Sequence, residues 1–227
     1  MNKNSKKIKK LVGIASLAAL VAVLQVISNY ITFGEVSITL ALIPMVVGAI
    51  LYGPLTGFGL GALMGVVIIT APSTATFLNF NVFATIVLCL LKTSLAGLAS
   101  GWIYKGIIRI NGLKKFKFPV AIIVATLVAP LINTGLFILG TSVIFQGLSY
   151  VDASGAEVVL VPSTGGFGAA FSGALSLVVA INFAIEFAIS VVLSPSIVYL
   201  TKVIGNKFDL GFCDDFKNIS LMENNLE

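Results

Sequence analysis

Apolar runs long enough to cross a lipid bilayer constrain this chain more than any other feature. A helix rises about 1.5 Å per residue and the hydrocarbon core is about 30 Å thick, so one crossing needs roughly 20 apolar residues. Six segments approach or exceed this length: residues 11–31, 38–53, 55–71, 80–104, 118–146 and 167–203. Tyr52, Gly53 and Pro54 predict a turn that joins the second and third segments. Only 10% of the 227 residues are charged and 58% are hydrophobic, which excludes an ordinary soluble domain. The sequence therefore predicts an all-α integral membrane protein with six transmembrane helices.

The distribution of lysine and arginine predicts the orientation. Cations precede the first span, fill the connection between the fourth and fifth spans and follow the sixth: Lys3, Lys6, Lys7, Lys9, Lys10, Lys105, Arg109, Lys114, Lys115, Lys117, Lys202, Lys207 and Lys217. The connections 29–37, 72–79 and 147–166 contain none. Because cytoplasmic loops retain cations, both termini are predicted to be cytoplasmic. The expected organisation is a basic N-terminal segment (1–10), a membrane domain (11–203) and a cytoplasmic tail (204–227).

Several functions are excluded by residue types that the sequence lacks. It contains no histidine, so histidine-based catalysis and haem ligation have no side chains to use. Cys89 lies in an apolar run and Cys213 in the tail, which argues against a redox pair. There is no phosphate-binding loop motif for ATP. The net charge of +5 is explained by cations flanking the spans and does not indicate nucleic-acid binding. We expect no enzyme activity and no cofactor or metal.

Polar residues inside the apolar runs are the candidate functional residues, because they are costly in lipid unless a neighbour or a ligand satisfies them. In the fourth run, Asn81, Thr85, Cys89 and Lys92 are spaced four, four and three residues apart, which predicts one helical face. The fifth and sixth runs each add a pair of polar residues. With two aromatic residues near the predicted outer surface, the candidate substrate-binding residues are Lys92, Asn79, Asn81, Thr85, Asn133, Thr134, Asn182, Glu186, Tyr30 and Phe33.

Two interpretations of Lys92 remain open. The structural one pairs it with Glu186, which lies at a comparable depth, so that each buried charge neutralises the other. The functional one places its ammonium against an anionic substrate, for instance a carboxylate, at the floor of an outward-facing pocket. The two are compatible, because a pair at the floor of a pocket can be shared with a ligand.

Small residues form two further patterns. Gly57, Gly61 and Gly65 are in register in the third run, and Gly97 and Gly101 follow in the fourth, as expected for closely packed helices. In the first run, small residues recur every four positions and predict a surface on which another helix docks. We call Ala15, Ala18, Ala19 and Ala22 the alanine strip.

The order of these features resembles the substrate-binding (S) component of energy-coupling factor (ECF) transporters, which take up vitamins in bacteria. The resemblance rests on the alanine strip, LIPMVVGAILYGPLTGFGLGALMG (42–65), KTSLAGLASGWIYKG (92–106), APLINTGLFILG (129–140) and INFAIEFAISVVLSPSIVYL (181–200). It implies a plasma-membrane protein that binds a vitamin in a pocket open to the outside, covered by the connection 29–37. The alanine strip would then dock on a membrane scaffold protein that carries two cytoplasmic ATPases.

The resemblance is nearest to the subgroup associated with pantothenate. Pantothenate has one carboxylate with hydroxyl and amide groups, which suits Lys92 and the Asn and Thr side chains. Riboflavin would need an aromatic cleft, for which Tyr30, Phe33, Phe77, Phe80 and Phe83 are available. Folate remains an alternative through its glutamate tail. A self-sufficient secondary transporter is a further alternative, although the two halves of the chain show no inverted repeat. The long connection 147–166 is expected to act as an additional lid or to be mobile.

Overall fold

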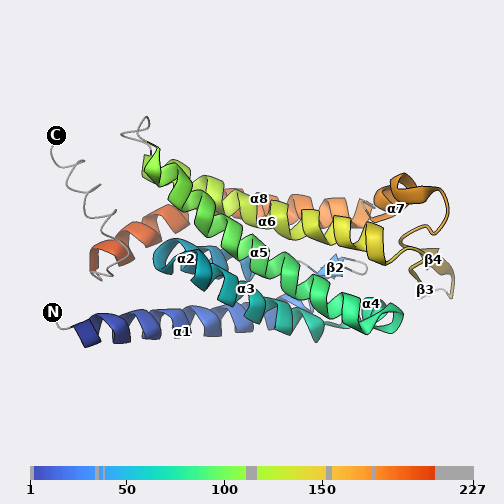
Figure 1. Cartoon of the computed structure of the whole chain (residues 1–227), viewed down its shortest axis with the longest axis horizontal. Helices are drawn as coiled ribbons and strands as arrows, with labels where there is room; N and C mark the ends of the chain where they lie inside the picture. Colours follow the sequence, from blue (N-terminus) through green and yellow to red (C-terminus); the bar gives the residue numbers. More distant parts are fainter. Residues whose placement is uncertain are drawn as a thin grey trace.

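The fold of the chain, seen in a computed structural model, is a bundle of long helices with two small hairpins in its connections (Figure 1). The structure describes residues 3–33, 36–37, 39–110, 117–151, 155–174 and 177–207. Its elements are α1 (Lys3–Ser28), β1 (Thr32–Phe33), β2 (Val36–Ser37), α2 (Leu42–Tyr52), α3 (Pro54–Ile69), η1 (Pro72–Thr74), α4 (Ala75–Phe80), α5 (Val82–Arg109), α6 (Lys117–Ile144), β3 (Ser149–Val151), β4 (Glu157–Val159), α7 (Gly166–Ala174) and α8 (Leu177–Lys207). The predicted tail beyond residue 207 and the cations Lys114 and Lys115 lie outside the described residues.

Helix lengths support a membrane protein but do not confirm six crossings. Among the described residues, four helical segments are long and apolar enough to span a membrane: Lys7–Ser28, Val82–Arg109, Lys117–Ile144 and Val179–Tyr199. A fifth crossing requires α3 and the segment Pro72–Phe80 together, and these are bent by 80°. Helix α2 has 11 residues. At about 1.5 Å per residue it is too short to cross a bilayer alone.

The residues just before α2 make tertiary hydrogen bonds. The predicted span began at residue 38, but α2 begins at Leu42. The backbone N–H of Thr39 donates to Glu186 and that of Leu40 donates to the Ser28 hydroxyl, so both are used in tertiary contacts. At its other end, α2 stops at Gly53, whose φ of 101° suits glycine, and Pro54 then begins α3. The predicted turn at 52–54 is therefore confirmed.

The predicted sixth span is divided into two helices. The described residues of this region form α7, with nine residues, and α8, with 31. Gly165 and Gly166, where α7 begins, both have positive φ, so α7 does not extend back toward β4. Helix α7 packs against α6 at the end of the bundle where β3 and β4 lie (Figure 1). Only α8 is long enough to cross the membrane.

The described parts of the connection 147–166 form an antiparallel hairpin. Strands β3 and β4 pair Ser149 with Val159 and Val151 with Glu157. The turn into the hairpin is fixed by Gly147, whose N–H donates to the Val161 carbonyl oxygen at 2.7 Å. Leu148 and Val161 are buried in a cluster with Phe145, the residue that follows α6. The hairpin is thus folded against the end of α6.

Helices α3 and α5 make the closest contact in the bundle, and glycines permit it. A Cβ on Gly61 would lie 2.7 Å from the Thr93 carbonyl carbon and 2.8 Å from the Ser94 Cα. A Cβ on Gly57 would lie 2.9 Å from the carbonyl carbon of Gly97. Atoms of a helix backbone cannot move aside, so these positions tolerate no side chain. The glycine register read from the sequence is therefore a packing surface inside the bundle.

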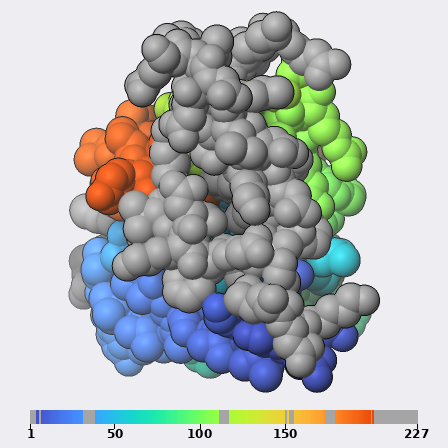
Figure 2. All heavy atoms as spheres, turned by 90° about the vertical axis from the view of Figure 1, so that its left-hand side faces the viewer, coloured from blue at the N-terminus to red at the C-terminus, as the bar shows by residue number. Residues whose placement is uncertain are grey.

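The two ends of the bundle differ. The start of α1 and the end of α8 lie at one end, whereas β2, β3, β4, α4 and α7 lie at the other (Figure 1). Helix α1 runs along one side of the bundle in both views and is the least buried of the four membrane-length segments (Figures 1 and 2). The predicted basic segment 1–10 is not separate from the first span, because α1 is continuous from Lys3.

Candidate functional site

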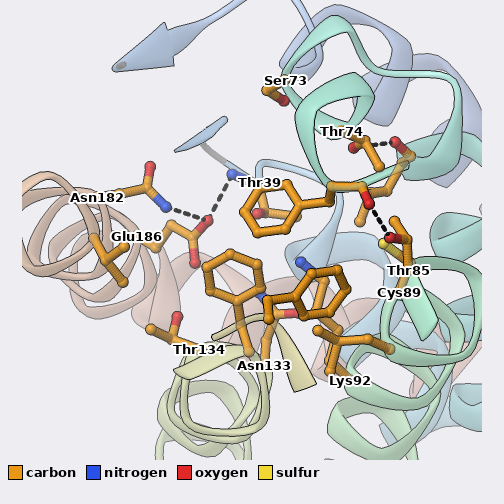
Figure 3. Close-up of a pocket in the computed structure, with 16 residues that line it drawn as sticks. Thr39, Ser73, Thr74, Thr85, Cys89, Lys92, Asn133, Thr134, Asn182 and Glu186 are labelled. Atoms are coloured by element: carbon orange, nitrogen blue, oxygen red, sulfur yellow. Dashed lines mark hydrogen bonds between the residues drawn. The ribbon is translucent and has the colours of Figure 1, made fainter. Parts of the chain in front are cut away.

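A pocket lies toward the end of the bundle that carries the hairpins. Its walls come from α3, η1, α4, α5, α6 and α8, with Thr39 from the connection between α1 and α2. The pocket is partly open, and about 60 Å³ of it can hold the centres of water-sized molecules. The lining residues are Thr39, Ile68, Ser73, Thr74, Phe77, Thr85, Leu88, Cys89, Lys92, Asn133, Thr134, Phe137, Phe145, Val179, Asn182 and Glu186 (Figure 3).

Lys92 is the cation of this lining. It lies in α5, is half-buried, and its Nζ is 4.6 Å from the centre of the Phe137 ring on α6. An ammonium over an aromatic face is stabilised by the ring quadrupole, by about 0.5–2 kcal/mol. In the part of the chain that is described, no ion pair or hydrogen bond joins Lys92 to Glu186, although both line the pocket. The ammonium therefore keeps its capacity to bind an anion.

Glu186 is buried on the opposite wall, on α8, with 3% of its surface exposed. Its Oε1 accepts two hydrogen bonds, from the Thr39 backbone N–H at 2.8 Å and from Asn182 Nδ2 at 3.3 Å (Figure 3). Its Oε2 has no hydrogen-bond donor among the described residues. One carboxylate thus ties the connection between α1 and α2 to α8 and still has a free oxygen.

Two asparagines add further acceptors. Asn182 lies one turn before Glu186 on α8, and Asn133 lies on α6, which packs against α8. The Oδ1 atoms of Asn133 and Asn182 are buried and receive no hydrogen bond within the described ranges. Thr134 lines the pocket beside Asn133. Buried polar atoms are rarely left unpaired, so this wall is built to receive donors from a ligand or from solvent.

The wall formed by α4 and α5 is mostly structural. Thr85 donates from its hydroxyl to the Phe77 carbonyl oxygen at 2.8 Å, and Thr74 donates to the Ile68 carbonyl oxygen at 2.8 Å (Figure 3). The Phe77 ring meets the rings of Phe137 and Phe145 edge to face, with centroids 5.6 and 5.5 Å apart. These contacts fix the entry into α5 and give the pocket an aromatic side.

Three predicted site residues are not in the pocket lining, and the side chain of a fourth is not described. Asn81 caps α5, where its side chain accepts a hydrogen bond from the Ala84 N–H at 3.0 Å and is turned away from the helical face predicted for it. Asn79 is exposed, and 78% of the surface of Tyr30 is exposed. Phe33 belongs to β1, but its side chain lies outside the described residues.

Sequence reasoning missed other pocket residues. Thr39 contributes a backbone N–H, which no side-chain pattern reveals. Ser73 and Thr74 lie in η1, a connection that the sequence analysis treated as a loop. Phe137 follows Asn133 by four residues, so the helical spacing used for α5 would have placed it on the same face of α6.

The alanine strip has two sides. Ala15 and Ala19 are exposed on α1, and Ala22 is half-buried. Ala18 packs against the core cluster formed mainly by α2, α3, α5 and α6. A docking surface on this helix would therefore use Ala15 and Ala19 rather than the whole strip.

The hydrogen bond from Thr39 to Glu186 makes a testable prediction about the connection between α1 and α2. Thr39→Pro removes the donating N–H. A hydrogen bond to a charged acceptor contributes about 1.5–3 kcal/mol, so local opening should become at least about tenfold more frequent. Hydrogen exchange of residues 28–41 in the purified protein measures this. Thr39→Ser keeps the N–H and should exchange at the wild-type rate. Equal exchange rates in the two variants would show that this hydrogen bond does not hold the connection between α1 and α2 in place.

Comparison with known families gives one match. The family model described as ECF transporter, substrate-specific component, matches residues 9–200. This range includes the pocket, the alanine strip and all the membrane-length helices except their outermost turns. No curated protein and no solved structure matched the chain.

Proposed function

Because the chain belongs to the family of ECF transporter substrate-specific components, we propose that it captures a water-soluble vitamin outside the cell for import by partner ATPases. The substrate binds in the pocket between α3, α5, α6 and α8. The chain contains no phosphate-binding loop, so the energy for import comes from the partner subunits. It is a transport subunit rather than an enzyme.

The observation that carries this proposal is Lys92. A cation in an apolar bundle is costly unless an opposite charge or a ligand compensates it. The described residues offer Lys92 an aromatic ring rather than a carboxylate, and its pocket is partly open. A substrate carboxylate at the ammonium would complete the site by a charge-assisted hydrogen bond.

Pantothenate is the vitamin that these groups fit best. Its carboxylate suits Lys92, while its two hydroxyls and amide N–H suit the acceptors of Glu186, Asn182 and Asn133. The aromatic cleft expected for riboflavin has less support. Of its candidate rings only Phe77 lines the pocket, Tyr30 and Phe83 are each 78% exposed, and the side chain of Phe33 is not described. Folate remains the alternative, since it also carries carboxylates.

The direction of access follows from the ends of the bundle. The pocket lies near the connections without lysine or arginine, and the lysine-bearing start of α1 and end of α8 lie at the opposite end (Figure 1). The positive-inside rule supports cytoplasmic termini and a pocket that faces the outside of a bacterial plasma membrane. Residues Asn79, Asn81 and Tyr30 would then lie near the rim rather than in the binding site.

Binding calorimetry in detergent tests this proposal with pantothenate and its carboxamide, which lacks the negative charge. Lys92→Met should lower the affinity for the acid about 10- to 100-fold, because it removes a contact of about 1.5–3 kcal/mol. The wild type should prefer the acid by a similar factor. Without ligand, the variant should melt within a few degrees of wild type, because no carboxylate among the described residues forms an ion pair with Lys92.

Lys7→Met is the matched control, because it removes one positive charge from the first turns of α1, far from the pocket. It should leave the affinity unchanged. Equal affinity of the wild type for acid and amide would contradict the carboxylate contact. A large loss of stability in Lys92→Met that Glu186→Gln restores would show instead that the two charges form a structural pair.

A further inference from the structure

The pocket has two chemically different sides. A substrate carboxylate at Lys92 would explain one side but not the buried acceptor atoms on the other. One side is Lys92 with Phe137, between α5 and α6. The other consists of three buried acceptor atoms from α6 and α8: Glu186 Oε2, Asn182 Oδ1 and Asn133 Oδ1, called here the acceptor wall. Their residues are 3%, 4% and 5% exposed. Figure 3 shows Asn182 and Glu186 on the opposite side of the pocket from Thr85 and Cys89.

The orientation of the Asn182 amide is fixed by its neighbour. Its Nδ2 donates to Glu186 Oε1, which can only accept while the carboxylate is ionised. The Asn182 oxygen must therefore be the atom left without a donor. Glu186 Oε1 is already occupied by Asn182 and by the Thr39 N–H, so the remaining capacity of this carboxylate lies on Oε2.

An unpaired buried acceptor costs about 1–3 kcal/mol, and a charged one costs more. A substrate that brings N–H or O–H groups to these atoms recovers that free energy. A substrate with only acceptors or apolar groups at this end leaves the cost in place. Such a site rejects an analogue that lacks its donors much more strongly than a hydrophobic pocket rejects an extra methyl group.

We infer that Glu186 is a specificity-determining residue, which selects substrates that present two or three hydrogen-bond donors opposite their anionic end. This inference rests on the proposed function and adds which chemical groups the substrate carries at the end opposite its carboxylate. Hydroxyl and amide N–H groups meet the requirement, as do the N–H groups of an aminopyrimidine-type ring. Oε1 of the same carboxylate accepts a hydrogen bond from the Thr39 N–H. The residue that selects the substrate therefore also anchors the connection between α1 and α2.

Glu186→Gln tests this inference with little change of shape. The glutamine oxygen can still accept from Thr39, whereas its NH₂ group replaces the acceptor Oε2 with a donor. Pantothenate, riboflavin and folate are first tested for binding to the wild type. Each one that binds is then compared with an analogue whose hydroxyl or N–H donors are methylated.

The wild type should bind the vitamin about 10- to 100-fold more tightly than the methylated analogue. In Glu186→Gln the affinity for the vitamin should fall by a similar factor, and the affinity for the analogue should change less than about threefold. Ser190→Ala is the control, because Ser190 is buried one turn further along α8 and does not line the pocket. It should keep the wild-type selectivity.

Several outcomes overturn the inference. A vitamin that binds the wild type supports the proposed function whatever the variant does. If Glu186→Gln then lowers the affinities for the vitamin and for the analogue equally, or changes neither affinity, Glu186 does not select substrates by their hydrogen-bond donors. A wild type that prefers the methylated analogue would show that this wall presents a donor. If none of the three vitamins binds the wild type, both the vitamin proposal and this inference fail.

Discussion

Replacing Gly61 with leucine should prevent the bundle from folding, whereas replacing Gly59 with alanine should not. Both glycines lie in α3. A Cβ on Gly61 would collide with the backbone of α5 at Thr93 and Ser94, but a Cβ on Gly59 would have nothing within 4 Å. A leucine at position 61 would separate α3 from α5 and open one wall of the pocket. We therefore expect no monodisperse protein from Gly61→Leu in detergent.

Alanine substitutions give the quantitative form of this prediction. Gly61→Ala should cost about 3 kcal/mol, the upper range for overpacking, and lower the melting temperature by roughly 6–12 °C. Gly59→Ala should be neutral or stabilising by up to about 1 kcal/mol, since alanine is the better helix former. Thermal unfolding of the two purified variants compares them directly. Equal melting temperatures would show that α3 and α5 are not in this close contact.

The second large effect concerns coupling to the partner subunits. Ala15→Trp and Ala19→Trp should each reduce vitamin uptake to background while leaving vitamin binding to the isolated protein intact. Both side chains are exposed on α1, at the side of the bundle, and a tryptophan there would prevent another helix from approaching closely. Uptake in cells that contain the complete transporter and binding in detergent are measured on the same variants.

Two controls separate docking from folding. Leu20 is also exposed on α1 but lies about 100° around the helix axis from Ala19, so Leu20→Trp should keep its transport. Ala18 packs on the core, so Ala18→Trp should reduce both stability and binding. If Ala15→Trp and Ala19→Trp lose binding together with transport, these residues belong to the bundle core and the docking assignment is wrong.

The sequence predicts the helical membrane class because its apolar runs have lengths that a bilayer dictates. It also predicts the turn at Gly53 and Pro54 and the glycine contacts of α3, since both depend on local backbone freedom. It does not predict that α2 is short. Nor does it predict the tertiary hydrogen bonds that the Thr39 and Leu40 N–H groups donate just before α2, because periodicity does not reveal such contacts.

The candidate site also combines features that the sequence predicts with features that it does not. Helical spacing brings Thr85 and Lys92 together on α5, and Asn182 and Glu186 on α8, and all four line the pocket. Asn81 has the same spacing but ends its helix, where capping the backbone turns its side chain away. Equal depth supports the pairing of Lys92 with Glu186, which is one of the two interpretations of Lys92 that the sequence leaves open. Depth does not determine which neighbours lie between two helices, and here the ring of Phe137 lies against Lys92.

The most direct test of the account is vitamin uptake by proteoliposomes that contain this chain, with or without the scaffold protein and its two ATPases. We predict uptake only when the complete set of subunits and ATP are present, and high-affinity binding without uptake when the chain is alone. Uptake by the chain alone, driven by an ion gradient and unaffected by ATP, would contradict the account and identify a self-sufficient secondary transporter.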